Sequence, residues 1–429
     1  MRRCGRSTTK REVSSNSMTV RRKPELLCPA GSMEALRTAL HFGADAVYGG
    51  MKAYGLRAFA GNFDEEQLRE AVELVHSRGK KFYLTMNIMP FDDQLEGFVQ
   101  AAKTAHAIGV DAAIVTDIGA IVTLREQVPG LALHVSTQAS TVNTPAVKHY
   151  QQLGCERVIL AREVGLERIS AMTSQLEGME IETFVHGASC VAYSGRCLLS
   201  SALTGRSGNQ GACAQPCRWQ YAVMEMKRPG EYLPVCEDAN GTYIFSAKDL
   251  NLMPILPELV NAGVASLKIE GRMKTEYYVA VVTGAYRRAI DLLWESEDRF
   301  RQELPTLMAE LACASHRESD TGFMLGAPEV PGGAEGFHQE REYIGRVMED
   351  AAADEGARIL LKNRFYAGDR LEVMTSGGVL SAEAKPFLRE KTGEILDTLG
   401  VAGEIIRMQL PFPVQAGDML RGPVRNHRR

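Results

Sequence analysis

A membrane-spanning helix requires about 18 consecutive apolar residues. The sequence has no apolar run that approaches this length, so we expect no membrane segment. It also lacks the H-E-x-x-H pattern of zinc proteases and the G-x-S-x-G turn of serine hydrolases, which argues against those two mechanisms. The formal charge is only −4, a balance that neither indicates nor excludes a nucleic-acid partner. With 45% hydrophobic residues in 429, the chain is typical of a cytoplasmic globular protein with one large and one small domain.

The N-terminal segment, residues 1–23, has no apolar core. Eight Lys or Arg residues accompany the single acid Glu12, so we expect this segment to be disordered. Its Arg- and Ser-rich composition leaves open an organelle transit peptide, a basic RNA-tethering tail, or an upstream extension with initiation at Met18. We favour a tail of no structural importance.

Cysteines are few, but they are unevenly placed. Of nine in the chain, four fall within 28 residues with the spacing C-x6-C-x15-C-x3-C, and these are Cys190, Cys197, Cys213 and Cys217. Glycines lie between them and allow the loop to fold back on itself, so that four thiolates can converge. The sequence therefore predicts a metal or iron–sulfur site in this loop.

Three uses of these cysteines are open. Two disulfides would need the same four residues, but we find no secretory signal before the domain, and the chain is long enough for a sizeable core. Structural zinc usually takes close C-x2-4-C pairs, and only Cys213 and Cys217 have that form. A loosely spaced loop of four cysteines is more typical of a 4Fe–4S cluster, which we favour over zinc.

From Glu25 onward, short apolar runs alternate with helical patterns. Eight runs are predicted to be strands buried on both faces, as in a parallel sheet, and they cover residues 25–29, 45–49, 81–87, 112–117, 131–136, 157–162, 181–186 and 265–270. Ser32 and Asp64 are candidate N-caps of the first two helices. This repetition favours an α/β fold of the TIM (β/α)8 type, with a doubly wound open sheet as the alternative.

The spacing of the predicted strands locates an insertion. The seventh and eighth strands start 84 residues apart, and the excess, residues 187–245, contains the four cysteines. Because the C-terminal ends of TIM-barrel strands face the active site, we expect this insertion to cover or line the barrel mouth. We assign residues 24–295 to the barrel, 296–335 to a linker, and 336–429, with its short strands and turns, to a small β-barrel-like domain.

Polar side chains gather at the predicted strand ends. A single polar side chain in such a place often only forms hydrogen bonds with neighbouring backbone groups. Because many of them occur at the strand ends together, they indicate a functional site. The candidates for substrate binding are Arg57, Arg162, Arg272, Lys268 and Gln138. The candidates for proton transfer are Glu270, His186 and His134. Guanidinium groups match carboxylates and phosphates, so we expect an anionic small molecule in the barrel mouth.

Several stretches resemble a known family. The sequence Glu182-Thr-Phe-Val-His-Gly-Ala-Ser-Cys190, continuing Val-Ala-Tyr-Ser-Gly-Arg-Cys197, resembles the signature of the collagenase-like peptidase family U-32. Leu27-Cys-Pro-Ala-Gly-Ser and Ser266-Leu-Lys-Ile-Glu-Gly-Arg272 match it as well, so the likeness covers most of the chain from Glu25 onward. Asn209-Gln-Gly-Ala-Cys213-Ala-Gln-Pro-Cys217 resembles the branch of this family that hydroxylates tRNA.

The resemblance to this branch implies a prephenate-dependent tRNA uridine hydroxylase that acts at C5 of the wobble uridine. It also implies a 4Fe–4S cluster on the matching cysteines, Cys190, Cys197, Cys213 and Cys217, with Cys236 as an alternative fourth ligand. The target base would be turned out of the anticodon loop to reach the site. Lys274, Arg218 and the C-terminal domain are candidates for contacting the tRNA backbone.

Two other functions stay open. The family name suggests a peptidase, and His186 lies four residues before Cys190, but the other three cysteines have no use in proteolysis. The chain could instead be a non-catalytic iron–sulfur partner in an oxygen-independent hydroxylation system for rRNA or a quinone. Assembly as a homo-oligomer or with another family member is also open.

Overall fold

The protein is represented by a computed structural model that describes residues 22–56, 61–190, 192–219, 236–238, 241–243, 248–326 and 337–425. Nearly all of the predicted tail and the predicted substrate-binding Arg57 lie outside these ranges, as do the side chains of Arg218 and Cys236. In the part that is described, no helix combines the length and the apolar character needed to cross a membrane.

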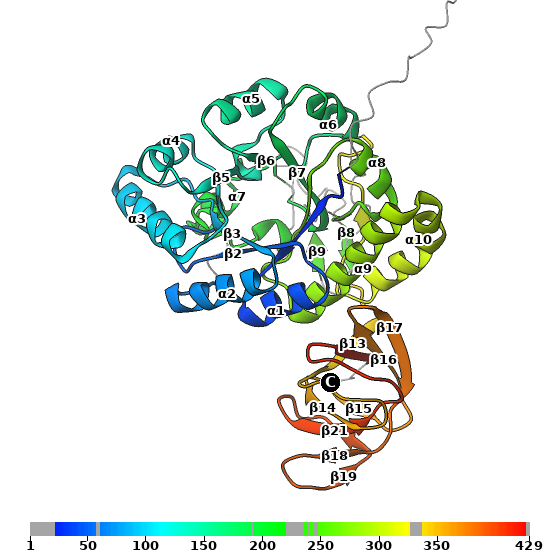
Figure 1. Cartoon of the computed structure of the whole chain (residues 1–429). Helices are drawn as coiled ribbons and strands as arrows, with labels where there is room; N and C mark the ends of the chain where they lie inside the picture. The colour runs from blue at the N-terminus through cyan, green and yellow to red at the C-terminus, as the bar shows by residue number, and fades with distance from the viewer. Residues whose placement is uncertain are drawn as a thin grey trace, which may run out of the picture.

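Eight parallel strands close into a barrel, as Figure 1 shows, and confirm the predicted TIM-type fold. They are β1 (Glu25–Pro29), β2 (Ala46–Gly50), β3 (Lys81–Met86), β4 (Ala112–Val115), β5 (Ala132–Val135), β6 (Arg157–Ile159), β7 (Glu180–Ala188) and β11 (Ser266–Ile269). Each pairs in parallel with the next, and β11 closes the ring by pairing with both β7 and β1. The open-sheet alternative is therefore wrong.

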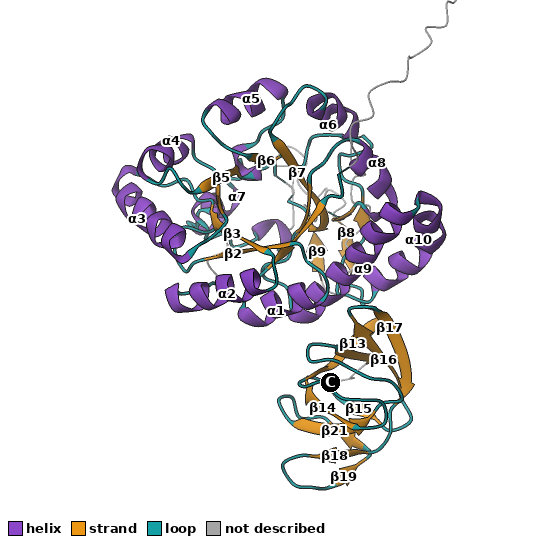
Figure 2. Cartoon of the chain, in the orientation of Figure 1, coloured by secondary structure: helices purple, strands orange, loops and turns teal. Residues whose placement is uncertain are grey.

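Helices between the strands form an outer ring around the barrel (Figure 2). They are α1 (Met33–His41), α2 (Glu65–Ser77), α3 (Asp92–Ile108), α4 (Ile118–Gln127), α5 (Thr144–Gln152), α6 (Leu166–Thr173), α8 (Leu256–Asn261) and α9 (Glu276–Glu295). Both predicted N-caps are confirmed, because the Ser32 hydroxyl accepts from the amide of Ala35 and Asp64 forms a capping box with Gln67. After α9, α10 (Glu297–Ala312) packs against it.

The insertion follows β7, and the elements in its described residues are short. These are α7 (Leu199–Thr204), the 3-10 turns η2 (Gly208–Gln210) and η3 (Pro216–Arg218), and the paired strands β8 (Cys236–Asp238) and β9 (Gly241–Tyr243). The chain then returns through β10 (Asp249–Asn251), which pairs antiparallel with the end of β7. The insertion thus starts and ends at the mouth of the barrel, where the sequence predicts it.

The C-terminal domain is antiparallel and all-β, as the sequence predicts. Its strands are β13 (Arg341–Val347), β14 (Gly356–Leu361), β15 (Phe365–Tyr366), β16 (Arg370–Thr375), β17 (Gly378–Glu383), β18 (Phe387–Arg389), β19 (Ile395–Leu396), β20 (Thr398–Leu399), β21 (Ile405–Gln409) and β22 (Met419–Pro423). Eight of them form one sheet in the order β17-β16-β22-β13-β14-β21-β18-β19. The domain has its own hydrophobic core, which includes Ile344, Val373, Phe387 and Ile406.

A buried arginine joins the two domains. The side chain of Arg421 on β22 is 3% exposed, and its two terminal nitrogens donate to the carboxylate of Glu310 on α10 at 2.6 and 2.8 Å. Its Nε donates to Glu372 on β16 at 2.7 Å. Nearby, Tyr277 of α9 stacks on Tyr343 of β13 with ring centroids 5.2 Å apart. Charge pairing and ring stacking therefore hold the small domain against the outer helices of the barrel.

We predict that Arg421→Met lowers the free energy of unfolding by about 3–5 kcal/mol, because Glu310 would lose its cation in a largely buried site and Glu372 would keep only Arg341. Chemical denaturation measures this change. The control is Arg358→Met, which removes a surface pair with Glu390 and should leave the midpoint nearly unchanged. Equal midpoints in the two variants would contradict the role given to Arg421.

Candidate active site at the barrel mouth

A pocket with about 500 Å³ of empty space, partly open to solvent, lies at the C-terminal end of the barrel strands. Five of the residues predicted for the site line it, namely Gln138, Arg162, Lys268, Glu270 and Arg272. They come from the ends of β5, β6 and β11, which lie far apart in sequence but share one rim. The structure therefore brings together four predicted substrate-binding residues and one predicted proton-transfer residue.

Two arginines lie on different sides of the pocket. Arg272 is 5% exposed, and its guanidinium donates to the hydroxyl of Thr85 on β3 at 2.8 Å. The guanidinium of Arg162 lies 4.3 Å from the ring centroid of Phe184 and 3.7 Å from the carboxylate of Glu270. The contact with the Phe184 ring holds Arg162, and the hydrogen bond to Thr85 holds Arg272. Both cations are therefore oriented before a ligand binds.

Lys268 supplies a third cation. Its ammonium lies 4.4 Å from the ring centroid of Tyr48 and 2.9 Å from the carboxylate of Glu182, which is fully buried on β7. Among the residues that line the pocket, Glu270 is the one carboxylate beside Arg162, Lys268 and Arg272. The balance of charge at the pocket favours a ligand with negative charge.

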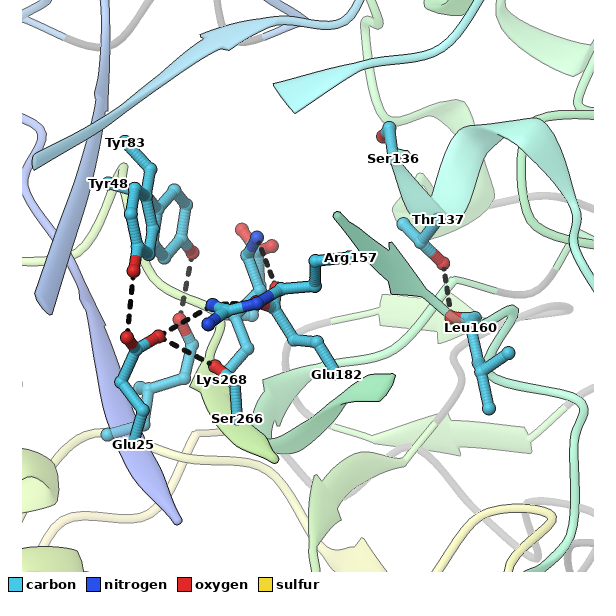
Figure 3. A network of polar contacts seen from close by, with 12 residues as sticks. Glu25, Tyr48, Tyr83, Ser136, Thr137, Arg157, Leu160, Glu182, Ser266 and Lys268 are labelled. Carbon is cyan, nitrogen blue, oxygen red and sulfur yellow. Dashed lines mark hydrogen bonds and ion pairs between the residues drawn. The ribbon is translucent and has the colours of Figure 1, made fainter. Parts of the chain in front are cut away.

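A network of ion pairs lies beneath the pocket inside the barrel (Figure 3). Arg157 on β6, with its side chain 4% exposed, pairs with Glu25 at 2.6 Å, Glu180 at 2.5 Å and Glu182 at 3.1 Å. The hydroxyl of Tyr83 donates to Glu25 at 2.8 Å. Through Glu182, this network also holds Lys268, so the charge on the pocket floor is anchored in the barrel core.

The two histidines predicted to transfer protons lie outside the lining of the pocket. His134 on β5 is buried against the ring of Tyr83, and burial, followed by the charges of Arg157 and Lys268, holds its pKa well below the usual value. His186 on β7 is buried against Tyr278 and Tyr286 of α9. Of the three predicted proton-transfer residues, Glu270 is therefore the one at the pocket.

The insertion is seated on the rim of the barrel beside the pocket. The amide and hydroxyl of Ser194 both donate to Glu163 at the end of β6, at 3.0 and 3.1 Å. Gly195 has a φ of +75°, and a Cβ at this position would lie 2.1 Å from the carbonyl oxygen of Gln138. On the far side, the side-chain amide of Gln210 donates to the carbonyl of Met89 after β3. The prediction that the insertion lies at the mouth is borne out by these contacts.

The four cysteines of the insertion belong to this rim. Cys190 is exposed, whereas Cys197, Cys213 and Cys217 are half-buried. Since Cys190, Cys197 and Cys213 are free thiols, two disulfides among the four are not present. Within the described ranges, no three or more Cys, His, Asp or Glu side chains form a group that could hold a metal ion. The thiols share one segment, but as they stand they do not form a metal-binding group.

Other residues of the site had weaker signals in the sequence. Tyr48 and Phe184 look like ordinary core aromatics, yet they lie against Lys268 and Arg162 in the pocket. Glu182 interrupts an apolar strand, and a charge in such a run is the signal that could have indicated the buried network. Asp117, also at a strand end, caps α4 instead of lining the pocket.

The fold and this rim define a TIM-barrel protein with a cationic pocket and a cysteine-bearing insertion. Residues 31–332 match the family model described as Peptidase family U32, and residues 339–421 match its C-terminal domain model. The chain belongs to peptidase family U32, as its resemblance to the family signature indicates.

Relatives of this chain are named for the hydroxylation of RNA. It is 38% identical to tRNA hydroxylation protein P of Escherichia coli, over 83% of this chain and 87% of that protein. It is 34% identical to tRNA hydroxylation protein P1 of Bacillus subtilis, over 95% and 97%. A third relative is the 23S rRNA 5-hydroxycytidine C2501 synthase of Escherichia coli, 38% identical over 63% of this chain and 40% of that protein.

Burial lowers the pKa of His186 to about 4, with Asp249 acting in the opposite direction. The unfolded chain therefore binds a proton at this residue at a higher pH than the folded chain, and stability should fall as the pH drops from about 6.5 towards about 4. We predict that His186→Gln flattens part of this fall, measured as denaturation midpoints at each pH. A profile unchanged in His186→Gln would contradict the neutral, buried state of this histidine.

Proposed function

We propose that the chain is a tRNA-modifying enzyme that hydroxylates C5 of the wobble uridine, with prephenate as co-substrate and a 4Fe–4S cluster as cofactor. The observation that carries the proposal is the cationic pocket at the barrel mouth, next to the cysteine-bearing insertion. The names of the relatives support the coarser statement that this chain is an RNA-modifying enzyme.

Prephenate carries two carboxylates, and the pocket offers cations on different sides. Arg272 and Arg162 present guanidinium groups suited to carboxylates, and Lys268 adds a fixed charge on the floor. Gln138 lines the same pocket and can donate or accept a hydrogen bond. We assign proton transfer to Glu270, because it lines the pocket and its carboxylate lies 3.7 Å from Arg162.

The proposed cluster ligands are Cys190, Cys197, Cys213 and Cys217, with Cys236 as the alternative fourth ligand and zinc as the alternative occupant. A bound cluster would supply redox or Lewis-acid chemistry beside the pocket. The cluster is proposed from the spacing of these cysteines and from the resemblance to the family signature.

Peptidase activity has weaker support. A cysteine protease needs its thiolate and its histidine within hydrogen-bond reach. His186 packs against two tyrosines of α9, whereas Cys190 is exposed on the insertion. The observations therefore favour the RNA-modifying function over the function that the family name suggests.

Deletion of the gene should remove 5-hydroxyuridine from tRNA, and the wild-type gene should restore it. A gene with Arg272→Gln should restore it poorly, with turnover reduced about 10- to 100-fold, because a charged contact to the co-substrate is lost. Nucleoside mass spectrometry measures the modification, and Arg37→Gln on α1 serves as the exposed control. A 5-hydroxyuridine pool that stays the same in the deletion strain would remove this function.

Anaerobically purified protein should contain iron and sulfide, and Cys190→Ser should lower both, because a thiolate ligand is lost. Iron and sulfide assays with visible absorption measure the change. Cys155→Ser changes a buried thiol outside the insertion and should retain the wild-type content. Full retention in Cys190→Ser would remove this residue from the ligand set.

A further inference from the structure

The first part of the insertion, residues 187–219, carries charge of one sign. Between residues 183 and 224 the sequence has three arginines, Arg196, Arg206 and Arg218, and neither aspartate nor glutamate. This is unusual in a chain where acids outnumber Lys and Arg by 53 to 49. Arg196 and Arg206 are exposed. A surface of this kind attracts a polyanion in preference to an acidic or neutral partner.

The same segment exposes large side chains that a core would normally bury. Tyr193 is 46% exposed, Trp219 43%, and Leu198 71%. Exposed aromatic rings interleaved with arginines are typical of surfaces that bind single-stranded nucleic acid, where bases stack on the rings and cations meet the phosphates. An apolar protein partner would not explain the absence of acids.

Hydrogen bonds connect the middle of the segment. Ser200 of α7 is 1% exposed, donates its hydroxyl to the carbonyl of Arg206 at 2.6 Å, and accepts from the amide of Ala214 at 3.0 Å. The Nε of Arg206 donates to the carbonyl of Ala212 at 3.0 Å. These bonds tie residues 200–214, which lie between Tyr193 and Trp219 in the sequence, to one another.

The position of the segment connects this surface to the pocket. Tyr193 precedes Ser194, which is bonded to Glu163 next to the pocket residue Arg162. On the other side of the mouth, a Cβ on Gly211 would lie 2.6 Å from the carbonyl oxygen of Gly55, beside the pocket residue Leu56. RNA bound to this segment would therefore lie beside the pocket opening.

We propose that the exposed side chains of the insertion, Tyr193, Arg196 and Trp219, bind an unpaired RNA loop by base stacking and phosphate contacts. This inference rests on the proposed function, since it takes RNA as the substrate, and it assigns the surface that receives the loop. Trp219 stacks on a base, and Arg196 meets the backbone.

The two tryptophans of the chain allow a direct test. Trp219 is 43% exposed on the insertion, and Trp294 is 42% exposed near the end of α9, which runs from the mouth to the opposite end of the barrel. Trp294→Phe leaves Trp219 as the reporter, and Trp219→Phe leaves Trp294. An anticodon stem-loop with a wobble uridine should quench the fluorescence of the full-length Trp294→Phe protein and leave that of Trp219→Phe unchanged. A duplex of the same stem without the loop should quench the Trp294→Phe protein less.

Binding of a labelled stem-loop, measured by anisotropy, gives a second readout that does not depend on turnover. Trp219→Ala should weaken binding about fivefold to a hundredfold, whereas Trp294→Ala should leave it unchanged. Arg196→Gln should reduce the slope of log K against log salt by about 0.7, and Arg299→Gln at the start of α10 should not change it. Circular dichroism of each variant confirms that it is folded.

Quenching of both single-tryptophan proteins alike, or of neither, would overturn the assignment. So would concentration-dependent self-association that Trp219→Ala abolishes without an effect on RNA, since the surface would then bind a second copy of the chain. If 5-hydroxyuridine is lost on gene deletion while these variants bind RNA normally, the surface is wrong and the proposed function stands. If the nucleoside pool is unchanged, the proposed function fails whatever the binding result.

Discussion

A buried carboxylate pairs with a lysine inside the barrel, and this ion pair holds a positive charge on the floor of the pocket. Lys268 lies 2.9 Å from Glu182, which has no exposed surface and also pairs with Arg157 at 3.1 Å. Removing Glu182 would leave Lys268 in the core without its carboxylate partner, and removing one partner of a buried ion pair is strongly destabilising. The positive charge on the pocket floor therefore belongs to the barrel core and does not rely on mobile loops.

The mouth of the barrel has two layers with different ligand preferences. The inner layer is the pocket, where Arg162, Lys268 and Arg272 favour a small anion. The outer layer is the first part of the insertion, residues 187–219, which has no Asp or Glu and exposes aromatic rings and arginines. Because the insertion is bonded to the strand ends that form the pocket, a co-substrate inside and an RNA base outside would meet at one opening.

Much of this arrangement follows from sequence pattern. Apolar runs predict all eight barrel strands, their spacing locates the insertion, and residues directly after strands, such as Arg162 and Arg272, reach the pocket. The sequence could not predict whether the side chains of His134 and His186 reach the pocket. The face of the sheet on which a strand residue lies depends on the register of pairing, and the register of the β7–β11 pairing shifts at Lys268. Whether four thiols converge depends on loop conformation, which spacing does not fix.

The central claim is that the three cations at the barrel mouth bind the carboxylates of a small co-substrate. A crystal structure of the anaerobically purified protein soaked with prephenate tests it most directly. The claim predicts density in the pocket with carboxylate oxygens within hydrogen-bond distance of Arg272 and of Arg162 or Lys268. Prephenate bound at another place, with this pocket holding only water, would contradict it.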